Sequence, residues 1–430
     1  MRFQSVLYLG SEEWRPLDLR SNLVNGSVSV SDSPSEPRPS GSGQPAVLIV
    51  GGGMIVHDQI LPSLYHLQRQ GRIGEISVCA TSHETVRKLA EAESLSRAFP
   101  GQSFRMYPAV PAPARQPDLF RQVIGRMPPR QLVVVAVPDQ LHHQVILEAL
   151  RHDQHVCAVK PLVLEHRQAV EIASEAYSRG LLVAVEYHKR FDDRSLMARR
   201  AYRGGHFGEF RLGTACLLEQ WYYRNSNFQN WMTADHSDAF TYIGCHYVDL
   251  VHFITGLLPV SVSVYGILDR FPNGNQGYLW TDARVIWENG ACLNVQNALG
   301  FPDAAPGTNT QGMTLYCQGA EGGGLIAHSD QYRGLKYCYT NPVVYAEPSP
   351  DYFQYVDLGG PGLTPVGYGY RSIEAIVAAA IRVNLEGPTV LDEIDRTGII
   401  ATPANSSYNE RVIEAARESI RNGGREVRWR

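Results

Sequence analysis

A short apolar run followed by three glycines constrains this chain more than any other feature. Residues 46–50 read AVLIV, Gly51-Gly52-Gly53 come next, and apolar residues at helical spacing begin at Ile55. The run fits G-x-G-x-x-(G/A) at its first two glycines, with Val56 at the third position. Such glycines let backbone N–H groups approach a pyrophosphate at a helix N-terminus. The feature therefore predicts a dinucleotide-binding unit, and a purely structural turn is the alternative.

Short apolar runs then alternate with helical stretches as far as residue 195. The runs lie at 76–80, 131–138, 155–160 and 181–187. Strands that are apolar on both faces and separated by helices are typical of βαβ units and a parallel sheet. We expect a Rossmann domain over 46–195, with its ligand crevice at the carboxyl ends of the strands.

Beyond about residue 200 the pattern changes to apolar–polar alternation, which predicts antiparallel strands. These strands should lie at 208–221, 260–271, 279–290 and 291–300, with one helix over about 238–255. A stretch rich in Gly, Pro and Tyr fills 301–370, and helices are predicted around 371–385 and 406–422. We expect a second domain of the α+β class over 196–430, whose closing helices could pack back on the first.

The first 45 residues are set apart by their composition. Residues 31–45 consist mainly of Ser, Pro and Gly, with almost no apolar content. Such a segment cannot offset the entropy cost of ordering itself. We expect residues 1–45 to form a flexible tail.

The net charge and the cysteines of the chain limit the partners and the cellular compartment that we expect. The 430 residues carry a net charge of −4, which argues against nucleic acid or an anionic membrane as the main partner. The seven cysteines form no C-x-x-C pair, and no export signal or membrane-spanning run is visible. We expect a cytoplasmic protein with reduced thiols.

The strand ends of the first domain supply the candidate cofactor contacts. No acid stands at the end of the second strand, where one usually binds the ribose diol, so repulsion against a 2′-phosphate is absent. Arg87 could bond such a phosphate, and the cofactor is therefore NAD or NADP. The cofactor-binding candidates are Gly51, Gly53, Met54, Ile55, Thr81, Ser82, Val137, Pro138, His142 and Lys160.

A lysine follows the fifth strand in the sequence Val159-Lys160-Pro161. The proline biases Lys160 away from helical dihedrals, and the end of the strand directs its side chain into the crevice. Close to a nicotinamide, this ammonium could relay a proton or polarise a carbonyl. A surface lysine is the alternative.

The predicted helix over 238–255 carries the other candidate catalytic groups. Tyr242 and His246 stand one turn apart on one face, and Asp249 follows at i+3 from His246. Histidine is the natural general base for oxidation of a hydroxyl group at neutral pH. A structural histidine and a metal site with His252 are alternatives. No further ligand cluster is evident, so we expect no metal.

The motifs VGGGM, VAVPDQLHH, HVCAVKP, VEYHKRF and IGCHYVDLVHFITG, in this order, resemble the Gfo/Idh/MocA oxidoreductases. The resemblance covers about residues 46–300 and extends more loosely to the closing helices. It implies a Rossmann domain, then an α+β domain whose open, mostly antiparallel sheet often mediates oligomers. It also implies hydride transfer between NAD(P) and a sugar or polyol. Lys160 matches the lysine of the E-K-P motif, and His246 matches the catalytic histidine.

Two positions depart from the pattern of that family. Val159 stands in place of the Glu of E-K-P, and Tyr242 stands in place of the Asp four residues before the histidine. A tyrosine can donate a hydrogen bond, but it is not an equivalent base at pH 7. Some relatives in the family resemble glycosidases that oxidise a sugar, eliminate the aglycone, add water and return the hydride. Tyr242 therefore raises the possibility of redox-neutral glycoside hydrolysis.

Aromatic and polar residues near the predicted helix point to a carbohydrate. Flat aromatic rings stack on sugar faces, while Arg and Asn bind hydroxyl or acid groups. A small aromatic core under a long loop, or packing at the domain junction, is the alternative. The substrate-binding candidates are Tyr187, His188, Trp221, Arg224, Trp231 and Asp249.

Taken together, the sequence predicts an α/β protein, with a Rossmann domain followed by an α+β domain. We expect an NAD(P)-dependent oxidoreductase that acts on a hydroxyl or ketone of a sugar, polyol or glycoside. Lys160, His246 and Tyr242 are its predicted catalytic residues, and a homo-oligomer is expected. The alternatives are a redox-neutral NAD-dependent glycoside hydrolase and a non-catalytic dinucleotide-binding regulator.

Overall fold

A computed structural model describes residues 44–305, 307, 309–320, 322–329, 337–340, 343–346 and 349–429. The tail predicted over 1–45 lies outside the described residues, except for its last two positions. Gln44, at the first of these, donates a hydrogen bond from its side chain to the carbonyl oxygen of Gly71 at 2.6 Å.

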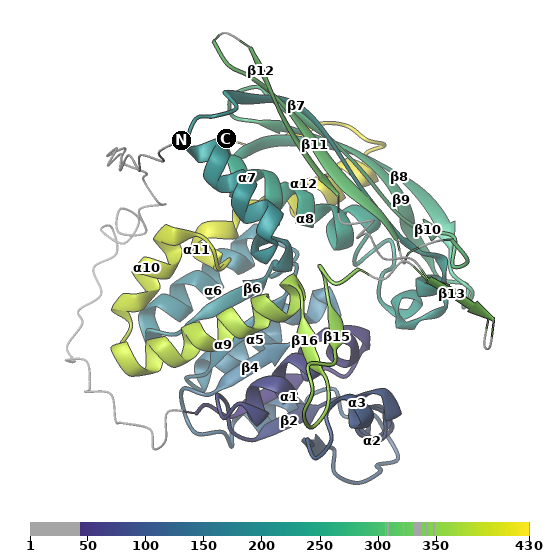
Figure 1. Cartoon of the computed structure of the whole chain (residues 1–430), viewed down its shortest axis with the longest axis vertical. Helices are drawn as coiled ribbons and strands as arrows, with labels where there is room; N and C mark the ends of the chain where they lie inside the picture. Colours follow the sequence, from purple (N-terminus) through teal and green to yellow (C-terminus); the bar gives the residue numbers. More distant parts are fainter. Residues whose placement is uncertain are drawn as a thin grey trace. The chain divides into compact units, whose positions relative to one another are not determined.

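The first sheet is parallel and has six strands in the order β3-β2-β1-β4-β5-β6 (Figure 1). Its central strands are buried on both faces, as continuous apolar runs predict. The predicted Rossmann sheet is thereby confirmed. Its strands are β1 (Val47–Val50), β2 (Ile76–Cys79), β3 (Arg105–Tyr107), β4 (Leu132–Val135), β5 (His155–Val159) and β6 (Val183–Glu186).

Helices connect these strands. The helical stretch after β2 is broken at Glu91 and Ala92, where two short helices meet. Ser82 begins the first of them by accepting a hydrogen bond from the backbone N–H of Thr85, which is an N-cap. The helices of this region are α1 (Leu61–Arg69), α2 (His83–Ala90), α3 (Glu93–Ala98), α4 (Leu119–Ile124), α5 (His142–Arg151) and α6 (His166–Arg179).

The second sheet has seven strands in the order β12-β11-β7-β10-β9-β8-β17. Only β7 and β10 run parallel, so the sheet is mostly antiparallel, as predicted. Two of its strands, β11 and β12, come from the stretch for which no element was predicted. The strands are β7 (Glu209–Gln220), β8 (Pro259–Arg270), β9 (Gln276–Trp287), β10 (Cys292–Phe301), β11 (Asn309–Gln318), β12 (Gly323–Ser329) and β17 (Val427–Arg428).

One face of this sheet is buried against α8 (Cys245–Thr255) and α12 (Tyr408–Arg421). The other face is open, and large apolar side chains such as Tyr265, Tyr316 and Leu325 are exposed on it. Two hairpins lie outside the sheet, formed by β13 (Tyr337–Thr340) with β14 (Val343–Ala346) and by β15 (Gln354–Val356) with β16 (Thr364–Val366).

The C-terminal helices contribute side chains to two hydrophobic cores, one under each sheet. Helix α9 (Tyr368–Glu386) buries Ile373, Ile376 and Val377 in the same cluster as β1, β2 and β4. Helix α12 instead packs mainly under the second sheet. The remaining helices are α7 (Asp193–Arg203), α10 (Thr389–Thr397) and α11 (Pro403–Ser406). Among the described residues, no helix has both the length and the apolar character that spanning a bilayer requires.

Candidate active site

The glycine-rich loop after β1 has the geometry that its sequence predicts. Gly51 has φ +123°, and a Cβ built there would lie 2.0 Å from the carbonyl oxygen of Ala136. Only glycine is tolerated in that conformation and contact. A Cβ on Gly53 would meet nothing within 4 Å, and the loop borders a cavity of about 330 Å³. The loop thus leaves its outer side open to a ligand.

The helix after this loop begins at Met54 and contains a π-helical segment, Val56–Ile60. Val56 is fully buried, so the third position of the motif serves helix packing even with a valine. N–H groups of a first helical turn lack intrahelical partners, and they favour an anion. The backbone of residues 52–55 therefore fits the diphosphate of a dinucleotide, whereas the N–H of Gly51 donates to the carbonyl oxygen of Cys79.

The residues that follow β2 offer only weak contacts by which NAD and NADP could be distinguished. Arg87, which could bond a 2′-phosphate, forms ion pairs with Glu84 and Glu91 on the surface. Such exposed pairs contribute little and can exchange partners. Thr85 and Lys88 border the cavity beside the glycine loop, although the sequence did not single them out.

His142, predicted to contact the cofactor, is fully buried. Its Nδ1 lies 2.8 Å from the carbonyl oxygen of Pro161, and its Nε2 lies 2.9 Å from that of Val137. Both ring nitrogens thus face backbone oxygens at the ends of β4 and β5. The structure therefore favours a role for His142 in holding these strand ends together, whereas Val137 and Pro138 remain half-exposed at the crevice.

Lys160 and Tyr242 are brought together, although 82 positions separate them. The ammonium nitrogen of Lys160 lies 3.5 Å from the centroid of the Tyr242 ring. It also donates a hydrogen bond to the carbonyl oxygen of Tyr242. An ammonium group over an aromatic face is attracted by the ring quadrupole. Lys160, directly after β5, therefore contacts the helical segment that precedes α8.

Tyr242 lies in a π-helical segment, Phe240–Gly244, directly before α8. Its ring packs against Phe228 and Trp231, at centroid distances of 4.9 and 5.8 Å. Burial raises the pKa of Tyr242 well above its ordinary value, and nearby carboxylates add to this. The phenol therefore remains protonated at neutral pH and can act as a donor.

His246 stands on the first turn of α8 and is only 4% exposed. Burial lowers the pKa of His246 well below its ordinary value, and the charges of His188, Lys160 and Lys189 lower it further. Its Nδ1 has no hydrogen-bond partner among the described residues. A neutral imidazole at this position can accept a proton.

The predicted substrate contacts divide into two groups. Trp231 and His188 lie beside the catalytic candidates, the first against Tyr242 and the second against His246. Arg224 is buried instead, donates to Leu299 and Asp269, and stacks on the half-exposed Trp221. Two of its guanidinium nitrogens thus have internal acceptors, while Nη2 is buried without a partner among the described residues. The two bonds favour a role in supporting the loop after β7.

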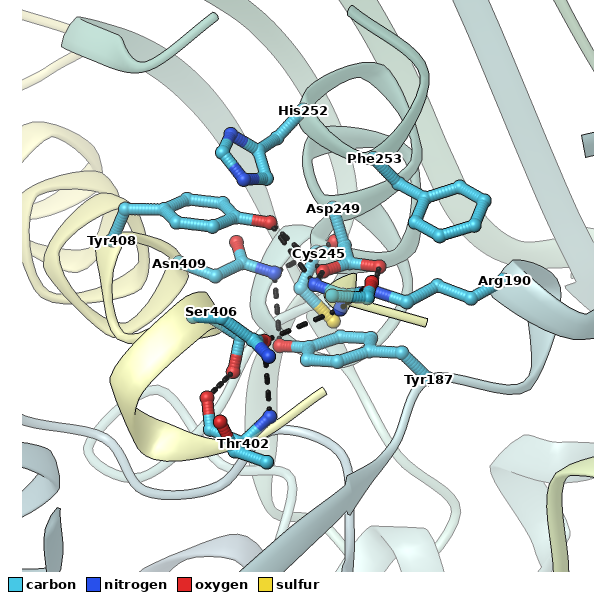
Figure 2. A network of polar contacts seen from close by, with 12 residues as sticks. Tyr187, Arg190, Cys245, Asp249, His252, Phe253, Thr402, Ser406, Tyr408 and Asn409 are labelled. Carbon is cyan, nitrogen blue, oxygen red and sulfur yellow. Dashed lines mark hydrogen bonds and ion pairs between the residues drawn. The ribbon is translucent and has the colours of Figure 1, made fainter. Parts of the chain in front are cut away.

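Tyr187 and Asp249 also have internal partners (Figure 2). The carboxylate of Asp249 accepts two hydrogen bonds from Arg190, at 2.6 and 2.8 Å, and one from Tyr408 at 2.9 Å. The hydroxyl of Tyr187 accepts from the side chain of Asn409 at 2.8 Å. These bonds fasten α8 to η3 (His188–Phe191) and α12, and substrate binding by either residue stays a prediction.

Two carboxylates near the catalytic candidates were not among the predicted site residues. Glu186 ends β6 and is 2% exposed. Glu219, at the end of β7, has a raised pKa because of its burial, opposed by the charge of Lys160. Their positions at strand ends are only a weak sequence signal, because polar residues are common there. Over the described residues, no group of three or more His, Cys, Asp or Glu side chains could hold a metal.

Comparisons with known proteins match part of the chain to a family. Residues 46–187 match a family described as an oxidoreductase family with an NAD-binding Rossmann fold. The D-glucoside 3-dehydrogenase of Escherichia coli is 24% identical over 221 residues, which cover 50% of this chain and 55% of that protein. The 2,7-anhydro-N-acetylneuraminate hydratase of Escherichia coli is 23% identical over 134 residues, covering 31% and 36%.

The chain spans between 21% and 55% of the length of the curated relatives that it matches. Similarity to solved structures covers much more of this chain than similarity to the curated sequences does. GenD2 from gentamicin A biosynthesis, crystallised in complex with NAD, covers 92% of this chain and 99% of its own, with 17% identity and a TM-score of 0.62. This similarity establishes the fold.

Proposed function

We propose that this chain, whose residues 46–187 match the Gfo/Idh/MocA oxidoreductase family, oxidises a hydroxyl group of a sugar, polyol or glycoside. NAD, when bound along the glycine loop, supplies the hydride acceptor. The observation that carries the proposal is the meeting of Lys160, Tyr242 and His246 at the carboxyl end of β5. In an open α/β sheet this is the edge where ligands bind.

Each of the three side chains has a distinct part in this proposal. His246 is neutral because of its burial and accepts the proton of the reacting hydroxyl. Lys160 stabilises negative charge that develops on the same oxygen. Tyr242 stays protonated and donates a hydrogen bond that orients the substrate.

The aromatic segment after β7 supports a carbohydrate as substrate. The hydroxyl of Tyr222 lies 3.3 Å from the sulfur of Met54, which places this segment beside the glycine loop. Trp231 reaches the ring of Tyr242 from the same segment. A sugar bound there would find flat apolar surfaces together with the polar groups of the crevice.

A redox-neutral reaction on a glycoside is the second candidate, and Tyr242 favours it. Its phenol stands where simple dehydrogenases of the resembled family have a carboxylate. A hydroxyl that remains protonated suits transfer of a proton to a leaving group better than removal of one. Similarity to proteins named as a hydratase and as a glucoside dehydrogenase is compatible with either reaction.

Cofactor analysis and a substrate panel test the proposal. We expect native mass spectrometry of the purified chain, incubated with NAD or NADP, to detect a bound dinucleotide. We expect a panel of free sugars, polyols and glycosides then to yield at least one substrate. Net oxidation gives a lasting rise in absorbance at about 340 nm, whereas redox-neutral cleavage releases sugar without one. Binding of neither nucleotide would reject both candidates.

We further propose that the open face of the second sheet pairs with another copy of the chain. Tyr265, Tyr316 and Leu325 are each more than half exposed there. Tyr316 and Leu325 are paired on β11 and β12 at one edge of the sheet, and Tyr265 lies on β8 near the other edge; exposed apolar side chains on a sheet face are typical of interaction sites. Light scattering should show an oligomer that Tyr316→Asp weakens, and a monomeric wild-type chain would contradict this.

A further inference from the structure

His188 and His246 lie against each other beside the predicted catalytic groups. Their ring centroids are 4.6 Å apart, with an angle of 37° between the rings. His188 belongs to η3, directly after the last strand of the parallel sheet, whereas His246 belongs to α8. Two imidazolium cations this close repel each other, so the pair takes up a first proton much more readily than a second.

A buried carboxylate distinguishes the two rings. One oxygen of Glu186 lies 3.1 Å from Nδ1 of His188, while its other oxygen accepts from Gln59 at 2.8 Å and from Ser372 at 2.6 Å. These bonds hold the carboxylate in place. Nδ1 of His246 has no comparable acceptor among the described residues. A proton on the pair is therefore better stabilised on His188 than on His246.

The charged and titratable groups around the pair come from several elements. Lys160 after β5 and Lys189 in η3 act on His246 and oppose a positive charge there. Tyr352 and Tyr368 pack against His188. Burial raises the pKa of both tyrosines well above their ordinary value, so they remain neutral below pH 10. Tyr187, beside His246, is neutral for the same reason.

We propose that the proton which His246 removes from the substrate comes to rest on His188, where the carboxylate of Glu186 stabilises it before release to solvent. This inference rests on the proposed oxidation, in which a C–H bond yields a hydride to the dinucleotide and an O–H bond yields the proton. His246 then returns to its neutral form. Glu186 acts only through His188 and is a positioning residue.

The test follows the proton affinity of the pair with and without Glu186. Histidine ring signals of the full chain are titrated by NMR in the wild type and in Glu186→Gln, with assignments from His188→Phe and His246→Asn. Gln keeps the size of the side chain and can still accept from Gln59 and Ser372. The control is Glu374→Gln, a carboxylate on α9 that pairs with Arg72.

We expect the first proton of the pair to bind on His188 in the wild type. In Glu186→Gln its midpoint should fall by about one pH unit, because a neutral group replaces the carboxylate. The control should keep the wild-type midpoint. An unchanged midpoint in Glu186→Gln, or a first proton on His246 in the wild type, would overturn the proposal.

His188→Phe gives a second, independent outcome, because a phenyl ring can keep the packing against Tyr368 and His246. The first proton must then bind on buried His246, so its midpoint should lie below that of the wild-type pair. The same midpoint in both chains would reject the proposal even if Glu186→Gln fails to fold. Once a substrate is known, the acidic limb of the pH profile of kcat/KM should also shift to lower pH in Glu186→Gln. The NMR titration needs no substrate, so a failed substrate panel would count against the proposed oxidation alone.

Discussion

The ammonium group of Lys160 lies over the ring of Tyr242 and donates a hydrogen bond to the backbone carbonyl of the same residue. One side chain from the parallel sheet is thus held by both parts of a residue next to α8. The contact fixes the distance between the strand end and the helix that carries His246. It also brings the ammonium beside the Tyr242 ring, and the charge of the same ammonium acts on the imidazole of His246, one helical turn further along.

The first prediction concerns the two groups with direct proton roles. Lys160→Met and His246→Ala should each lower turnover by about 10²–10⁴-fold, the usual effect of removing a positioned acid–base group. Binding of the dinucleotide, measured by calorimetry, should persist in both. The exposed His206 offers a matched control, since His206→Ala should retain wild-type turnover. Near-normal turnover in either active-site variant would remove that residue from the mechanism.

The second prediction separates the two proposed reactions through Tyr242. If the chain is a net dehydrogenase, Tyr242→Asp should keep or raise oxidation of a free sugar, because a carboxylate replaces the phenol beside Lys160. If it is a redox-neutral hydrolase, the same change should abolish cleavage of glycosides while a transient absorbance near 340 nm survives. Tyr242→Phe preserves the ring under Lys160. Cleavage at full rate in that variant would show that the hydroxyl transfers no proton.

Much of the fold follows from local sequence patterns. A strand buried on both faces must be apolar throughout, and a turn as tight as that at Gly51 excludes other residues, so the Rossmann unit could be predicted. Lys160 and His246 follow from motif positions, and in the structure Lys160 contacts Tyr242, one helical turn before His246. The π-helical segment 240–244 could not be foreseen, because apolar spacing does not distinguish it from an ordinary helical turn.

The internal partners of the substrate candidates could not be predicted either. Asp249 and Arg190 are 59 positions apart, and their ion pair depends on how α8 packs against η3. Strands β11 and β12 were missed because glycines and tyrosines interrupt their alternation. Glu186 was missed because a polar residue at a strand end is common, and only packing shows that it faces a histidine.

The third prediction tests the role of Asp249. Both side chains of its pair with Arg190 are 2% exposed, and removing one partner from a buried pair leaves the other charge uncompensated. Asp249→Asn should lower the free energy of unfolding in urea by about 3–5 kcal/mol. The surface pair of Arg371 and Asp193 is the control, because Asp193→Asn should cost less than about 1 kcal/mol. A stable Asp249→Asn chain with a raised KM would instead support substrate binding by Asp249.

The fourth prediction concerns pH and stability. Burial raises the pKa of Glu410 on α12 from 4.5 to about 8. The folded chain therefore binds this proton more tightly than the unfolded chain, and the resulting stability is complete below pH 4.5 and lost as the pH rises to 8. Glu410→Gln removes the titration. Its free energy of unfolding relative to wild type should rise by about 1.4 kcal/mol per pH unit in that window.

The exposed Glu418 on the same helix provides the control for this effect. Glu418→Gln should run parallel to wild type across the whole range. A constant difference between Glu410→Gln and wild type from pH 5 to pH 8 would show that Glu410 is ionised in the folded chain throughout.

The last prediction compares two glycines of one loop. A methyl group at Gly51 would meet the Ala136 carbonyl oxygen at 2.0 Å in a backbone conformation that alanine avoids, so Gly51→Ala should lower the free energy of unfolding by at least about 2 kcal/mol. A methyl group at Gly53 meets no atom within 4 Å, so Gly53→Ala should change stability by less than about 1 kcal/mol. If the diphosphate of NAD lies against this loop, the same methyl group intrudes on it. Calorimetry should then show NAD binding weakened about tenfold or more in Gly53→Ala, a loss of about 1.4 kcal/mol. Unchanged NAD affinity in a folded Gly53→Ala chain would mean that the nucleotide does not bind at this loop.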